Sequence, residues 1–98
     1  MKFGLREEVI EKIQQVLAKY PQINQAILYG SRAKGTYKNG SDIDITLKGA
    51  ELNLRLLSQI SHELDDLLIP YKIDLSIFHE IENADLLEHI GRVGVEFV

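Results

Sequence analysis

The sequence predicts a single α+β domain in which a small mixed β-sheet has helices packed on one face, in the order α-β-α-β-α-(β). Three observations support this class. The 98 residues are enough for one domain with one modest core. Apolar residues recur at helical spacing in some segments and alternate with polar residues in others. No internal repeat, low-complexity segment or linker divides residues 1–98.

Two long segments have the apolar periodicity of amphipathic helices. Residues 5–19 form the first, and Pro21 ends it because proline cannot continue the hydrogen-bond pattern. Residues 51–67 form the second, which ends before Pro70. Each helix therefore has one apolar face that can cover a sheet.

Short extended segments follow each of these helices. Residues 25–29, 42–47 and 72–78 are apolar or alternate apolar with polar side chains, as strands do. Between the first two strands, residues 31–35 can form one helical turn, and residues 38–41 have the composition of a loop.

The C-terminal segment predicts a third helix and a short final strand. Asn83 can cap a helix over residues 84–90, and Gly91 and Gly94 are expected to end it. Residues 95–98 then form the final strand.

Composition and charge narrow the class of protein. The net charge of −4 is uneven, because residues 1–38 carry +4 and residues 39–98 carry −8. This acidic half argues against a broad nucleic-acid-binding face, which needs clustered basic residues. The chain has no cysteine, no signal-peptide core and no apolar stretch that could span a membrane. We therefore expect a cytoplasmic protein.

Three aspartates are the strongest functional signal. Asp42 and Asp44 share one face of their strand because side chains alternate with period two, and Asp74 lies in the next strand. If these strands are neighbours, the carboxylates converge opposite the aliphatic face. Such like charges repel unless a cation binds them, and oxygen ligands favour magnesium. For the Asp42–Asp44 pair alone, a solvated polar face is an equally good interpretation.

A glycine-serine turn precedes the aspartates. Gly30 and Ser31 follow a strand and open the helical turn, so the backbone can approach a phosphate closely. Arg32 and Lys34 could neutralise phosphate charge. The alternative is a plain strand-to-helix turn. Neither of the familiar phosphate-binding motifs, Gly-x-x-x-x-Gly-Lys-Ser/Thr or Gly-x-Gly-x-x-Gly, is present.

The histidines give no comparable signal. His62 and His89 lie in separate predicted helices, and His79 follows the third strand. Nothing in their spacing brings them together as metal ligands, so we expect a surface or structural role for each.

Taken together, Gly30-Ser31, ten intervening residues, Asp42-Ile43-Asp44 and the later Asp74 resemble the signature of the DNA polymerase β-like nucleotidyltransferase superfamily. The stretch from Tyr29 to Ile45 is similar to its minimal members, the MNT proteins. The resemblance covers nearly the whole chain and implies the nucleotidyltransferase fold.

The resemblance also implies roles for individual residues. Asp42 and Asp44 would bind two Mg²⁺ ions, and Asp74 would complete the site of the ion that activates the attacking hydroxyl. Gly30 and Ser31 would hold the β- and γ-phosphates of a nucleotide triphosphate, with Arg32 assisting. ATP is the implied donor.

MNT proteins resemble the antitoxin half of two-gene modules whose other half is an all-helical HEPN protein. The resemblance therefore implies AMP transfer to a tyrosine of a HEPN toxin. Two alternatives stay open: an antitoxin that neutralises its partner by binding alone, and nucleotidyl transfer to a small molecule. The sequence also leaves a homo-oligomer open.

Overall fold

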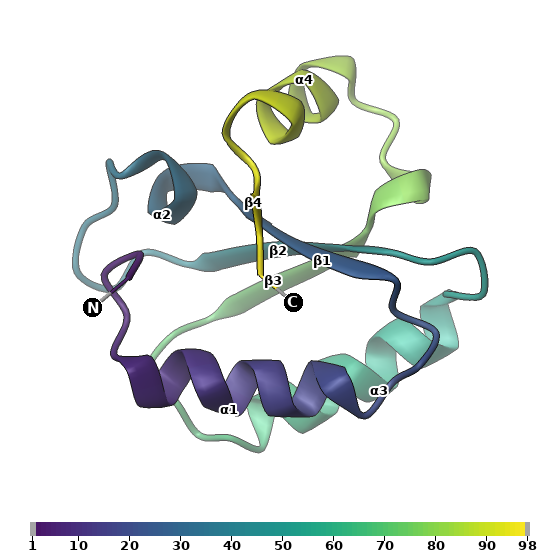
Figure 1. The fold of residues 1–98 in the computed structure, drawn as a ribbon, viewed down its shortest axis with the longest axis horizontal. Coiled ribbons are helices and arrows are strands. Elements are labelled where there is room, and N and C mark those ends of the chain that lie inside the picture. The colour runs from purple at the N-terminus through teal and green to yellow at the C-terminus, as the bar shows by residue number, and fades with distance from the viewer. Residues whose placement is uncertain (1, 98) are drawn as a thin grey trace.

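A computed structural model of the chain describes residues 2–97. Eight helices and strands alternate along the chain, and a short 3₁₀ turn follows the third strand (Figure 1). In chain order they are α1 (Glu7–Ala18), β1 (Gln25–Tyr29), α2 (Gly30–Lys34), β2 (Ile43–Lys48), α3 (Leu54–Asp65), β3 (Ile73–Ile77), the 3₁₀ turn (Phe78–Glu80), α4 (Ala84–Val93) and β4 (Val95–Glu96).

The four strands form one mixed sheet, in the order β3-β2-β1-β4. Strand β2 runs parallel to β3 and antiparallel to β1, and β1 is also antiparallel to β4. The α+β class and the mixed sheet are therefore confirmed. The parallel pair β2–β3 is joined by α3, as such pairs require a long crossover connection.

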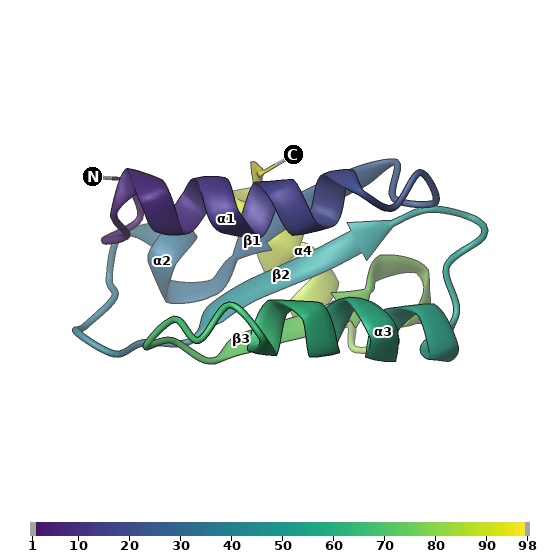
Figure 2. The same cartoon turned by 90° about the horizontal axis from the view of Figure 1, so that it is seen from below.

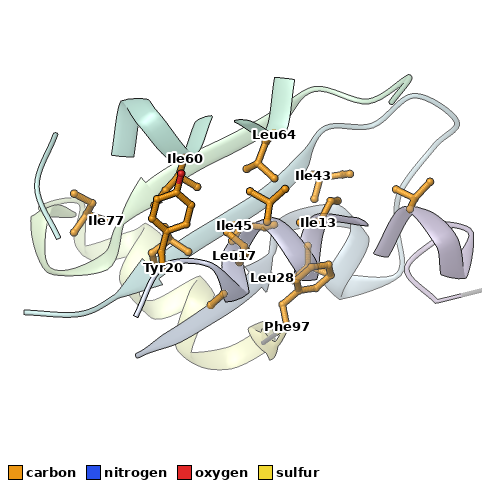
Figure 3. Packing of buried hydrophobic residues seen from close by; sticks show 14 of the residues in the cluster. Ile13, Leu17, Tyr20, Leu28, Ile43, Ile45, Ile60, Leu64, Ile77 and Phe97 are labelled. Carbon is orange, nitrogen blue, oxygen red and sulfur yellow. The ribbon is translucent and has the colours of Figure 1, made fainter. Parts of the chain in front are cut away.

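Helices α1 and α3 lie side by side on one face of the sheet and form the main core with it (Figure 2). Ile13 and Leu17 of α1 and Ile60 and Leu64 of α3 are fully or almost fully buried there. Strand β2 contributes only alternate side chains to this core, as its period of two requires. Figure 3 shows the side chains of the two helices meeting those of the strands.

Helix α4 differs, because it packs against the opposite face of the sheet. Its Ile90 forms a second buried cluster with Ile27 and Tyr29, which alternate along β1 with the core residues Ala26 and Leu28. Figure 1 shows α1 and α3 below the sheet and α4 above it. The expectation of helices on one face therefore holds for α1 and α3, whereas α4 covers part of the other face.

Several boundaries differ from those expected. The observed order, α-β-α-β-α-β-α-β, contains two elements more than the expected order, although each element lies in a segment expected to be helical or extended. Gly91 does not end α4, which continues to Val93 with Gly94 as its cap. A glycine within a helix costs only about 1 kcal/mol, which the packing of Ile90 offsets.

The helix caps follow the sequence more closely. The Asn83 side chain accepts hydrogen bonds from the backbone N–H groups of Asp85 and Leu86, at 2.9 and 3.1 Å, as expected of an N-cap. Asn53 caps α3 in the same way, so this helix begins later than residue 51. Val98 of the expected final strand lies outside the described residues. No helix within residues 2–97 has the length and apolar character needed to cross a membrane.

Candidate active site

The parallel pairing of β2 and β3 brings two of the predicted aspartates together. Asp44 and Asp74 are register partners on neighbouring strands, and Asp42 lies two residues before Asp44, just ahead of β2. Since Ile43 and Ile45 point into the core, the three aspartates belong to the opposite face. Asp42 and Asp74 are exposed, whereas Asp44 is half-buried. Among residues 2–97, none of the three forms an ion pair.

The electrostatics of this group favour a bound cation. The pKa of Asp44 is raised above its ordinary value, first by burial and then by the negative charges of Asp74 and Asp42, while His89 lowers it. Ionised carboxylates at such close quarters repel one another. A divalent cation would convert that repulsion into attraction.

These residues fit magnesium in their donor chemistry. All three offer the hard oxygen ligands that Mg²⁺ prefers. Within residues 2–97, no three acidic or histidine side chains are gathered closely enough to hold a metal by themselves. A magnesium ion at this site would therefore need further oxygen ligands, from substrate phosphates and water.

The glycine-serine turn lies directly against Asp44. Gly30 begins α2 with a φ of +76°, a left-handed conformation that favours glycine. A Cβ atom at this position would lie 2.2 Å from Oδ2 of Asp44, so a side chain here would displace that carboxylate. Ser31 follows and is partly exposed. The absence of a side chain at Gly30 thus allows the start of α2 to approach the carboxylate.

Arg32 does not take the position expected of a phosphate ligand. Its side chain is only 2% exposed, and its guanidinium donates to the carbonyl oxygens of Phe3, at 2.8 Å, and Ser41, at 3.0 Å. The same group lies over the rings of Tyr37 and Tyr71. The structure therefore corrects this assignment: Arg32 joins the N-terminal segment to the loop just before Asp42.

His89 of α4 is a site residue that the sequence did not reveal. Its Nε2 accepts a hydrogen bond from the backbone N–H of Gly30, at 3.1 Å. Its ring meets the ring of Tyr29 edge-on, with centroids 6.3 Å apart. The one sequence signal for this contact is that β1 has apolar side chains on both of its faces. Ile27 and Tyr29 lie on the face that α1 and α3 leave uncovered.

Tyr29 of β1 is the register partner of Asp44 and therefore adjoins the aspartates. The pKa of its hydroxyl is raised, first by burial and also by the charges of Asp74 and Asp44, while the neighbouring Ser76 lowers it. Ser76 in turn donates to Thr46 Oγ1 at 2.9 Å. The carboxylates therefore adjoin a layer of neutral, hydrogen-bonded hydroxyl groups.

The aspartates form an open rim at one end of β2, where Asp42 and Asp74 are exposed. A cavity of about 520 Å³ lies at the other end of this strand and is lined by Lys48, Gly49, Ala50, Phe78 and His79. Because Asp42 and Asp74 face solvent, a large acceptor can approach the carboxylates directly.

Comparison with known proteins gives one family and several similar folds. Residues 11–98 match the family described as polymerase beta, nucleotidyltransferase. A solved toxin–antitoxin structure with AMP-PNP has a TM-score of 0.74 at 24% identity, covering 91% of this chain and 72% of that one. A tri-AMPylated Shewanella oneidensis HEPN toxin in complex with its MNT antitoxin has a TM-score of 0.71 at 20% identity, covering 96% and 72%. None of the curated proteins matches the sequence.

Proposed function

The chain belongs to the polymerase beta nucleotidyltransferase family, and we propose that it transfers AMP from ATP to a hydroxyl group of a protein partner. The observation that carries this proposal is the register pairing of Asp44 with Asp74, beside a turn whose glycine cannot be replaced without meeting Asp44. This arrangement gathers carboxylates next to a backbone that can approach a phosphate.

The three aspartates would hold the metal and the reacting groups. Asp42 and Asp44 would bind two Mg²⁺ ions, and Asp74 would complete one of the two sites. Bound magnesium supplies positive charge at the phosphates and lowers the pKa of the attacking hydroxyl. A carboxylate oxygen of Asp74 accepts the hydroxyl proton. The hydroxyl oxygen then attacks the α-phosphorus, the bond from this phosphorus to the bridging oxygen breaks, and pyrophosphate leaves.

The glycine-serine turn would bind the rest of the triphosphate. Gly30 allows the backbone to approach the β- and γ-phosphates, and the Ser31 hydroxyl donates a hydrogen bond to them. Arg32 has no part in this proposal, because its guanidinium is buried against two backbone carbonyls. ATP as donor is supported by the AMP-PNP in a structure of the same fold.

The acceptor we propose is a tyrosine of an all-helical HEPN-type partner, which makes this protein an antitoxin. The open rim supports a macromolecular acceptor, since Asp42 and Asp74 are accessible from outside. A structure of the same fold holds an MNT antitoxin with an AMPylated HEPN toxin. We place this activity in the cytoplasm, where ATP is available.

Transfer of label from α-labelled ATP tests the proposal. The protein is added with Mg²⁺ to lysate of the source organism, and a single labelled helical protein is expected. The Asp42→Asn/Asp44→Asn variant should abolish the label. The matched control is Asp65→Asn/Asp66→Asn, which neutralises two exposed carboxylates at the end of α3 and should leave the label unchanged.

Two outcomes would contradict the proposal. Label that persists in the Asp42→Asn/Asp44→Asn variant would remove these carboxylates from the chemistry. Absence of label with the wild type, while both proteins retain the same partner, would favour an antitoxin that acts by binding alone.

A further inference from the structure

Helix α4 is fixed against β1 by close packing. Ile90 is buried between Ile27 and Tyr29 of that strand. At the end of the helix, a Cβ on Gly94 would lie 2.8 Å from Cγ2 of Ile27 and 2.4 Å from the Ile90 carbonyl oxygen. The missing side chain of Gly94 therefore lets α4 and β1 approach one another. This contact sets where the residue before Ile90, His89, can reach.

The His89 side chain reaches the first peptide group of the glycine-serine turn. His89 Nε2 accepts the hydrogen bond from the Gly30 N–H, so in the neutral ring the proton is on Nδ1. The peptide between Tyr29 and Gly30 is planar, and fixing the direction of its N–H fixes the whole plane. This plane determines how closely Gly30 can lie against Asp44.

We propose that His89 is a positioning residue, whose Nε2 holds the Tyr29–Gly30 peptide so that the turn is preformed for the triphosphate. This inference rests on the proposed nucleotidyltransferase function and adds a residue that contacts neither phosphate nor acceptor. The Gly30 N–H is occupied by His89, so the phosphates take their hydrogen bonds from Ser31. A preformed turn saves the free energy that ATP binding would otherwise spend on ordering it.

Two substitutions separate the acceptor nitrogen from the ring. His89→Phe keeps an aromatic ring edge-on to Tyr29 but has no hydrogen-bond acceptor. His89→Gln loses the ring but offers an amide oxygen at similar reach. The matched control is His62→Ala, which removes an exposed histidine from α3. All three variants are compared with the wild type by thermal denaturation to confirm that they are folded.

The first measurement is hydrogen exchange of the Gly30 amide, which requires no catalysis. Slow exchange is expected in the wild type, His62→Ala and His89→Gln, and exchange at least about tenfold faster in His89→Phe, because one hydrogen bond is lost. Equal exchange in the wild type and His89→Phe would overturn the proposal at the level of the contact.

The second measurement is steady-state AMP transfer, together with the dissociation constant for AMP-PNP. His89→Phe should raise the KM for ATP and the dissociation constant for AMP-PNP by about five- to tenfold, with kcat within twofold of the wild type. The reason is that the turn binds the ground state and the transition state alike. His89→Gln should restore the wild-type values. Unchanged KM and binding in His89→Phe, or failure of His89→Gln to restore them, would overturn the proposed role of His89 but not the proposed function. A wild type that binds no ATP analogue would overturn the proposed function itself.

Discussion

The two faces of β2 place opposite demands on one strand. On the face toward α1 and α3, Ile43, Ile45 and Leu47 are completely buried among apolar side chains. On the other face, Asp44 is crowded by Asp74 and Asp42, and its pKa is raised as a result of burial and of their charges. The first face stabilises the fold, and the second carries a repulsion between carboxylates that a bound cation would relieve. Stability and chemistry are therefore separated residue by residue.

The largest expected effect is a loss of activity from a substitution on the face of β2 that carries Asp44, here called the open face. Asp44→Asn should reduce AMP transfer by about 10³-fold or more, because it removes a ligand and a charge that the proposed metal ions need. The free energy of unfolding should not fall. Label transfer and urea denaturation of the same sample measure both quantities. A variant that loses stability as well as activity would contradict the separation of the two faces.

A substitution on the closed face of β2, which packs against α1 and α3, should have the reverse result: a loss of stability without a comparable loss of activity. Ile45→Ala should lower the free energy of unfolding by about 2–5 kcal/mol, because a fully buried side chain leaves a cavity. Transfer per folded molecule should stay within a few-fold of wild type, measured well below the denaturation midpoint. Ile45→Val is the graded control, with an expected loss of about 0.5–1.5 kcal/mol. A large loss of activity in the still-folded Ile45→Val variant would show that the two faces are coupled.

Gly30 sharpens the comparison, since it combines backbone strain with a clash at the site. Gly30→Ala should lose about 1–2 kcal/mol of stability from the positive φ alone, and should also displace Asp44 and reduce transfer by about tenfold or more. Gly35→Ala is the matched control, because Gly35 has a φ of +90° but no atom within 4 Å of its added Cβ. It should show the stability loss without the loss of transfer. Equal transfer rates in the two variants would argue against the contact with Asp44.

The smallest effect is the pH dependence of stability. The folded state raises the pKa of Asp44 above its ordinary value of 3.8, so ionising this group destabilises the fold at neutral pH. The destabilisation is relieved as pH falls through the folded pKa and is absent below the unfolded one. Asp44→Asn should therefore be more stable than wild type at pH 7, by less than about 1 kcal/mol because solvent screens this half-exposed group.

The stability difference between the two proteins should shrink on acidification, measured by thermal denaturation from pH 7 to pH 4. Addition of Mg²⁺ at pH 7 should stabilise the wild type more than Asp44→Asn, because a ligand stabilises only the state that binds it. A difference that grows as the pH falls would contradict the assigned direction of the pKa shift.

Features that depend on local periodicity can be predicted from the sequence. Alternation along residues 42–47 separates the isoleucines from the aspartates, and the structure confirms the core side of that division. The pairing of Asp44 with Asp74 further requires that β2 and β3 be neighbours and pair in this register. The metal-binding role of these aspartates stays a prediction that the experiments above test.

Features set by long-range packing could not be predicted in the same way. His89 and Gly30 are 59 positions apart, and their contact depends on α4 packing against the second face of β1. Arg32 stands in a turn with other basic residues and has the sequence context of an exposed phosphate ligand. Its burial depends on carbonyl groups of Phe3 and Ser41, and backbone carbonyls have no sequence signature.

The register of β2 against β3 also has a consequence for evolution. Deleting Leu75 from β3, with the pairing of Ser76 and Ile77 kept, would turn Asp74 toward the core and Ile73 toward the carboxylates, because a shift of one position exchanges the two faces of a strand. A deletion at the exposed Leu68, in the connection between α3 and β3, would shorten a loop and leave this register in place. Length variation among descendants of this protein should therefore collect in that connection, while both strands keep a constant number of residues.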